Sequence, residues 1–107
     1  ATGTTTVGIT VNPGAAAPAA PSNLAGSVGS NRLVTLNWTD QSSNETGFYV
    51  ERAVKAKNLQ FSRIATVAAN VNTYSHTGMS GQWVYRVQAY NAVGVSAYSN
   101  NVTLRVR

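Results

Sequence analysis

The stretch that decides the fold is WVYRVQAYNAVGVSAY, residues 83–98. In its first half every second side chain falls on the same side of an extended strand. The inward set is Trp83, Tyr85, Val87 and Ala89, and the outward set is Val84, Arg86, Gln88 and Tyr90. A turn near Gly94 then leads into further strand-like sequence. The alternation predicts a strand in an antiparallel sheet that is covered on one face only.

The same alternation recurs from about residue 23 to residue 107, and no segment has a helical period. The runs are short and are separated by polar or glycine-containing turns, which is typical of a sandwich or barrel. Besides a first strand near residue 23, they are LVTLNW (33–38), FYVER (48–52), QFSRIATV (60–67), NVNTYSHTG (70–78), WVYRVQAY (83–90) and NNVTLRVR (100–107). We therefore predict an all-β, seven-stranded antiparallel β-sandwich.

The inward positions of these runs predict the core. Its main members are Trp38, Phe48, Val50, Trp83, Tyr85, Val87 and Leu104. The phase of residues 60–67 is ambiguous, and a bulge between Phe61 and Ile64 would let both side chains face the core.

The first twenty residues have a different composition. TTTVGITV (4–11) alternates like a strand, and all three prolines of the chain lie in residues 13–21 amid alanines. Proline favours extended backbone, so we predict a semi-rigid linker over residues 13–20. Residues 1–12 are then the last strand or tail of a preceding domain, and residues 21–107 are the domain itself. The alternative is that residues 4–11 form an extra strand of this domain.

Composition and charge limit the function classes. Among 107 residues, 43% are apolar and 10% are charged, and there is no cysteine to form a disulfide or a thiolate metal site. The net charge of +5 comes from scattered basic residues, of which only Lys55 and Lys57 are close in sequence, so nucleic acid is not an expected partner. No apolar run is long enough to predict membrane insertion.

The titratable residues do not suggest catalysis. Asp40 and Glu45 share one polar loop, and Glu51 lies on an outer sheet face, so no two carboxylates are expected to face each other across a cleft. His76 is the only histidine, and Ser80 lacks the setting of a nucleophile elbow. Turn hydrogen bonds and one surface ion pair are the expected roles of the three acids. We predict no enzyme activity, no metal and no cofactor.

The chain resembles a fibronectin type III domain over residues 21–107. The resemblance rests on PSNL (21–24), LNWTD (36–40), ETGFYVER (45–52), and above all on YRVQAYN (85–91) followed by AVGVSAYSN (92–100). It implies an immunoglobulin-like sandwich with Trp38 at its centre. The family's sixth strand opens with a tyrosine that hydrogen-bonds to the preceding turn; Trp83 stands there and offers one N–H donor. No Arg-Gly-Asp occurs in residues 91–96, so the integrin-binding role of some members does not carry over.

The resemblance to prokaryotic members implies a function. We expect a non-catalytic spacer or accessory module of a secreted multidomain bacterial protein that acts on polysaccharide or at the cell surface. Its partners would be neighbouring domains of the same chain, with polysaccharide as a candidate ligand. The alternative is a carbohydrate- or cell-surface-binding module that uses Tyr49, Arg86 and Tyr90 on the outer face. A third class, an animal-type adhesion repeat, is disfavoured by the Ala/Pro linker and the missing Arg-Gly-Asp.

Overall fold

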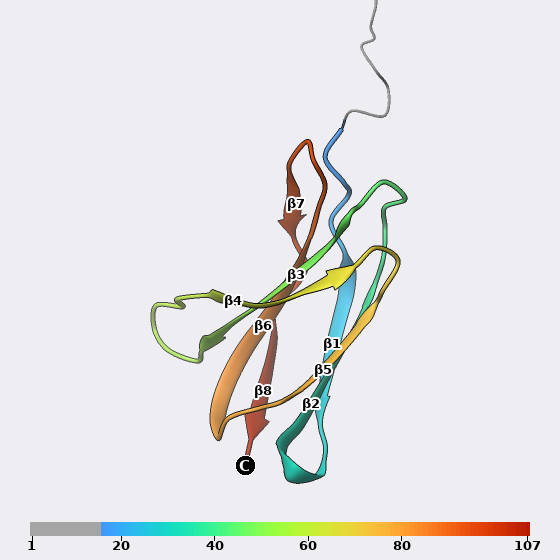
Figure 1. Cartoon of the computed structure of the whole chain (residues 1–107). Coiled ribbons are helices and arrows are strands. Elements are labelled where there is room, and N and C mark those ends of the chain that lie inside the picture. The colour runs from blue at the N-terminus through green and yellow to red at the C-terminus, as the bar shows by residue number, and fades with distance from the viewer. Residues whose placement is uncertain (1–15) are drawn as a thin grey trace, which may run out of the picture.

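The chain folds as an all-β sandwich of two antiparallel sheets (Figure 1). The computed structural model describes residues 16–107. One sheet has the order β1-β2-β5, and the other has the order β4-β3-β6, with β7 and β8 both pairing with β6. The strands are β1 (Ser22–Val28), β2 (Leu33–Thr39), β3 (Gly47–Val54), β4 (Ser62–Ala68), β5 (Thr73–Thr77), β6 (Gly81–Tyr90), β7 (Val95–Tyr98) and β8 (Val102–Val106). The predicted sandwich is confirmed.

The structure has eight strands instead of seven because the segment after Gly94 pairs with β6 twice. β7 pairs with the end of β6, and β8 pairs with its beginning. Between them the backbone N–H of Val87 donates to the Ser99 hydroxyl at 3.0 Å, where a regular ladder would offer a carbonyl. The N–H of Ser99 in turn donates to the Val87 carbonyl at 2.8 Å. Serine at this point therefore divides the last strand without leaving the central strand unpaired.

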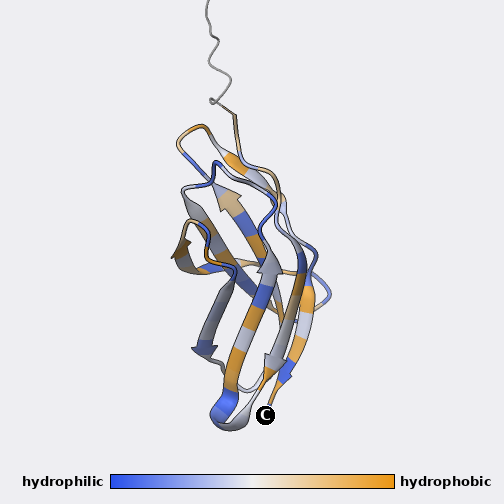
Figure 2. Cartoon of the chain, turned by 90° about the vertical axis from the view of Figure 1, so that its right-hand side faces the viewer, coloured by the Kyte–Doolittle hydropathy of each residue, from blue (hydrophilic) through white to orange (hydrophobic). Residues whose placement is uncertain are grey.

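The core lies between the sheets and is built from the alternating apolar positions, which appear as bands along the strands in Figure 2. Trp38 meets Phe48 edge to face, with ring centroids 5.5 Å apart. Burying each such side chain stabilises the fold by about 1.5–3 kcal/mol. The buried cluster consists of Leu24, Val34, Leu36, Trp38, Phe48, Val50, Tyr85, Val87, Ala89 and Val106.

Two residues assigned to the core, Trp83 and Leu104, pack against it but remain partly exposed. Leu104 lies on β8 and reaches across to β1 at Gly26. A Cβ at Gly26 would come within 2.9 Å of Leu104 Cδ1, so the missing side chain makes room for the leucine. Trp83 reaches toward the turn before β6, where its indole N–H donates to the carbonyl of Met79 at 2.9 Å.

The ambiguous phase of residues 60–67 is resolved differently for Ile64 and Phe61. The structure does contain an irregularity in the β3–β4 pairing, where Val50 pairs with Ala65 and Glu51 with Arg63, so that Ile64 is the extra residue. Ile64 packs against the core. Phe61, however, precedes β4 and lies on the outer face, 3.8 Å below the Arg86 guanidinium. Here the bulge lets only one of the two side chains turn inward.

The chain entering the domain is held against its end. Residues 1–12, assigned to a preceding domain, and residues 13–15 of the assigned linker lie outside the described residues. Within residues 16–20, Pro18 is buried, and the carbonyl of Ala16 accepts hydrogen bonds from the side-chain amides of Asn44 at 3.0 Å and Asn91 at 2.8 Å. This described part of the linker is therefore docked on the loops between β2 and β3 and between β6 and β7.

Candidate functional site

The outer face of β3 and β6 carries Tyr49, Arg86 and Tyr90, the residues assigned to a ligand face. The two strands pair so that Glu51 lies opposite Arg86 and Tyr49 opposite Gln88. Because Tyr90 is two residues beyond Gln88, it lies diagonal to Tyr49 on the same face. The structure therefore brings the three residues onto one surface.

The rings of Tyr49 and Tyr90 stack on each other. The rings of Tyr49 and Tyr90 are parallel within 2°, with centroids 4.2 Å apart. The guanidinium of Arg63, from β4, lies 3.5 Å from the Tyr49 ring centroid. Stacking on a sugar ring requires a free aromatic face, and the contacts with Tyr90 and Arg63 use the faces of Tyr49.

Arg86 is enclosed in the same way. Its guanidinium lies 3.8 Å from the centroid of Phe61 and 3.5 Å from that of Tyr98. Its Nε and Nη2 donate to the same carboxylate oxygen of Glu51, at 2.9 and 2.8 Å. The pairing of Glu51 with Arg86 that the strand alternation allows is thus formed. Glu51 is only 8% exposed and Gln88 only 6%, so this outer face is covered largely by its own side chains.

The other two acids form a small network in the β2–β3 loop. The Ser42 hydroxyl lies 2.9 Å from Glu45 Oε1 and 3.3 Å from Asp40 Oδ1, and the N–H of Asn70 donates to Glu45 Oε2 at 2.9 Å. Burial and the neighbouring Glu45 carboxylate raise the pKa of Asp40. Burial also acts to raise the pKa of Glu45, but hydrogen bonds from Asn70 and Asp40 outweigh it and lower that pKa. The network joins two loops, and its two carboxylates converge on the Ser42 hydroxyl.

His76 lies on β5 with its Nε2 3.1 Å from the hydroxyl of Tyr85, and its ring stacks on Tyr74 with centroids 5.5 Å apart. Burial lowers the pKa of His76, and the positive charge of Arg52 lowers it further. The Arg52 guanidinium also lies 4.2 Å from the Trp83 ring centroid. Within residues 16–107 no group of three or more His, Cys, Asp and Glu side chains is placed to hold a metal. In the same range, no helix is long and apolar enough to cross a membrane.

Sequence reasoning missed two polar features. Asn44 and Asn91 converge on Ala16 from two loops 47 residues apart, and nothing in the local sequence indicates that their side chains meet. Arg32, Arg105 and Arg107 line a pocket at the opposite end of the sandwich. The sequence showed these basic residues as scattered because the turn and the strand that carry them are far apart in the chain.

No protein-family model and no curated protein matches the chain. Solved structures do match it. An Fn3-like protein from Clostridium thermocellum has a TM-score of 0.70 at 24% identity, over 84% of this chain and 94% of that one. The FN1–FN3 domains of chicken CNTN1 match with a TM-score of 0.70 at 28% identity, over 84% of this chain and 33% of that one. Titin kinase and its flanking domains match with a TM-score of 0.71 at 24% identity, over 84% of this chain and 17% of that one.

These matches define the class of protein: the chain has the fibronectin type III fold. The strand orders β1-β2-β5 and β4-β3-β6, with the last strand beside β6, agree with it. The chain spans about a third of the chicken CNTN1 fragment and nearly all of the Clostridium protein. The fold is therefore one that occurs both as a domain among others and as almost an entire chain.

Proposed function

We propose that this domain is a non-catalytic spacer or accessory module of a secreted, bacterial multidomain protein that acts on polysaccharide or at the cell surface. The observation that carries the proposal is the docked entry segment. Two asparagine side chains, Asn44 and Asn91, donate to one backbone carbonyl, that of Ala16. A domain that fixes the direction of the chain leading into it suits a role in spacing its neighbours.

The places where the described chain enters and leaves the sandwich support the same role. Residues 16–21 lie at the end of the sandwich that holds the β2–β3 and β6–β7 loops, whereas β8 runs to the opposite end (Figure 1). Pro18 and Pro21 are buried, and proline restricts the backbone of the docked segment. Units joined through this domain would therefore be separated by the length of the sandwich with limited freedom at the entry.

The test is a distance measurement across the domain. Because the chain has no cysteine, Ala17→Cys and Thr103→Cys provide two exposed labelling sites, and the distribution of energy transfer between dyes attached there is recorded. The spacer role predicts a narrow distribution that widens in the Asn44→Ala/Asn91→Ala double variant. The matched control is Asn58→Ala/Asn101→Ala, which removes two exposed amides elsewhere. A wild-type distribution as wide as that of the double variant would contradict the proposal.

The alternative is a carbohydrate-binding module acting through Tyr49, Arg86 and Tyr90. Contacts within the face weigh against it, because these side chains stack on one another, on Arg63 and on aromatic neighbours. Tyr98 is the most exposed ring of the group at 40%. The test is a pull-down of the protein from solution by insoluble cellulose, chitin or pectin. Binding that is lost when Tyr49, Arg86 and Tyr90 are replaced with serine would favour the alternative over the spacer.

A further inference from the structure

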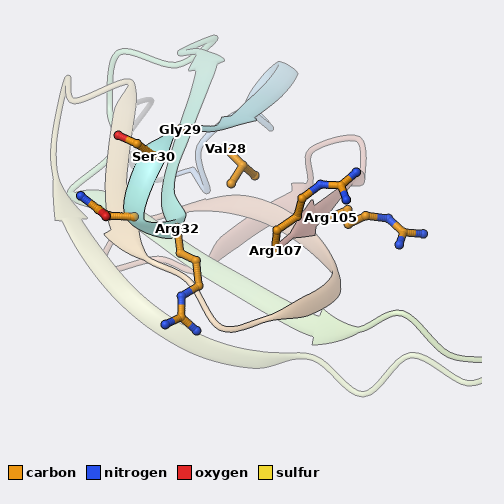
Figure 3. Close-up of a pocket in the computed structure, with 7 residues that line it drawn as sticks. Val28, Gly29, Ser30, Arg32, Arg105 and Arg107 are labelled. Carbon is orange, nitrogen blue, oxygen red and sulfur yellow. The ribbon is translucent and has the colours of Figure 1, made fainter.

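The basic end of the sandwich contains a pocket of about 320 Å³ between the β1–β2 turn and the end of β8 (Figure 3). The turn contributes Arg32 and β8 contributes Arg105, and Arg107 is the first residue after β8. Asn31 and Arg32 both have positive φ, 57° and 61°, as the two central residues of a tight hairpin turn do. This backbone conformation fixes where the Arg32 side chain leaves the turn.

No acidic side chain neutralises the pocket arginines. The chain has only three acids. Glu51 is paired with Arg86 on the outer face, and Asp40 and Glu45 lie in the β2–β3 loop at the other end of the sandwich. Among residues 16–107 the ion pair formed is that of Arg86 with Glu51, so no acidic side chain pairs with Arg32, Arg105 or Arg107. Guanidinium groups bind oxyanions through paired N–H donors.

The arrangement favours a ligand with several spaced anionic groups. Arg105 on β8 and Arg107 just after the strand are two residues apart, about 6.6 Å in extended backbone, and both side chains run toward the same side in Figure 3. The Arg32 side chain leaves the other rim of the pocket in a different direction, and its Nη1 donates to the Ser80 hydroxyl at 3.3 Å (Figure 3). A ligand that reaches the arginines of both rims would therefore have to be extended and to carry more than one anionic group.

We propose that this pocket binds an acidic polysaccharide, through carboxylate or sulfate groups held by Arg105 and Arg107 on one rim and Arg32 on the other. The choice of polysaccharide rests on the proposed function. The pocket lining also argues against single-stranded nucleic acid, because it contains no aromatic side chain on which a base would stack. A duplex needs more phosphate contacts than three arginines provide.

The experiment measures binding of the whole chain to polygalacturonate, which carries carboxylates, and to heparin, which carries sulfates. Neutral dextran, inorganic sulfate and duplex DNA are the comparison ligands. Arg105→Gln/Arg107→Gln is expected to weaken glycan binding about tenfold, equivalent to about 1.4 kcal/mol. Lys55→Gln/Lys57→Gln is the matched control, since it removes the same charge from an exposed loop, and it is expected to change affinity less than about twofold. Preference between the two glycans identifies the anionic group.

The proposal would be overturned if neither glycan bound, or if the arginine and lysine variants lost the same amount of glycan affinity. It would also be overturned if inorganic sulfate were the only ligand bound. The fourth contrary outcome is duplex DNA binding at least as tightly as the glycans and losing the same affinity in the arginine variant. Circular dichroism of each variant establishes that it folds, and Arg32→Gln alone provides a second variant outside β8. The distance measurement across the domain does not depend on these arginines, so failure of glycan binding would leave the spacer role standing.

Discussion

The side chain of Asn100 makes two hydrogen bonds to the backbone of Leu24. Its side-chain carbonyl accepts from the Leu24 N–H at 2.8 Å, and its side-chain amide donates to the Leu24 carbonyl at 2.9 Å. Leu24 belongs to β1 of one sheet, and Asn100 lies between β7 and β8 of the other. One side chain thus supplies, across the open edge of the sandwich, the two hydrogen bonds that a neighbouring strand would make.

We therefore expect Asn100→Ala to lower the free energy of unfolding by about 1–2 kcal/mol, since each lost hydrogen bond is worth about 1 kcal/mol. Asn100→Asp should also destabilise, because a carboxylate would face the Leu24 carbonyl without a donor. Urea denaturation measures both. Asn101→Ala, at the exposed neighbouring position, is the control and should change stability by less than about 0.5 kcal/mol. Equal effects at the two positions would show that the two Asn100 hydrogen bonds contribute nothing to the free energy of unfolding.

Trp83 occupies the place of the family's corner tyrosine and makes the corner's hydrogen bond with its indole N–H, to Met79. Trp83→Phe removes that donor, and we expect a loss of about 1–2 kcal/mol from the hydrogen bond and the smaller ring. Trp83→Tyr restores a donor at the position where the family uses one, so it should be the more stable variant by about 1 kcal/mol. Thermal unfolding of the two proteins gives the comparison, and indistinguishable curves would argue against a corner bond.

The strands were predictable because each strand has one buried face, and period-two alternation reports that directly. The side chains that contact Tyr49 and Arg86 on the outer face were not predictable from the sequence. Arg63, Phe61 and Tyr98 reach Tyr49 and Arg86 from β4, from the segment before it and from β7. Their placement depends on where the β3–β4 irregularity falls and on how the last strand divides, and neither is visible in a local pattern.

The burial of outward polar residues was missed for a related reason. Alternation gives the face on which Glu51 and Gln88 lie, but it does not show that long aromatic and arginine side chains cover that face. Gln88 is held there by its amide donating to the Ser96 carbonyl at 2.8 Å. Hydrogen bonds between distant loops, as from Asn44 to Ala16, likewise depend on the completed fold.

The Glu51–Arg86 pair should be worth more than an exposed ion pair. Both side chains are largely buried, and two N–H groups of Arg86 converge on one oxygen of Glu51. A double-mutant cycle of Glu51→Gln with Arg86→Met should give a coupling of about 1–2 kcal/mol, above the 0.2–1 kcal/mol of exposed pairs. Arg86→Lys should not rescue, because an ammonium cannot stack flat between Phe61 and Tyr98. A coupling near zero, or one abolished by about 0.5 M salt, would show that the pair behaves as a solvated one.

The last prediction concerns pH and rests on His76. Its surroundings are Arg52 from β3, Tyr85 from β6 and Tyr74 from its own strand. Burial and then the Arg52 charge lower the pKa of His76 in the folded state below its ordinary value of 6.5. The unfolded chain therefore binds more protons than the folded one between the two pKa values, and stability rises with pH across that interval. The contribution of His76 is complete above pH 6.5 and is lost progressively as the pH falls toward the folded-state value.

Urea denaturation at steps between about pH 5.5 and pH 7.5 should therefore show stability decreasing toward the acid side. Because His76 is the only histidine, His76→Gln should flatten the profile in this range while keeping an amide able to hydrogen-bond to the Tyr85 hydroxyl. Burial raises the pKa of Asp40, so protonation of this carboxyl favours folding as the pH falls toward the range in which carboxyl groups titrate. An NMR titration of the His76 ring that gave a pKa at or above 6.5 would refute the argument.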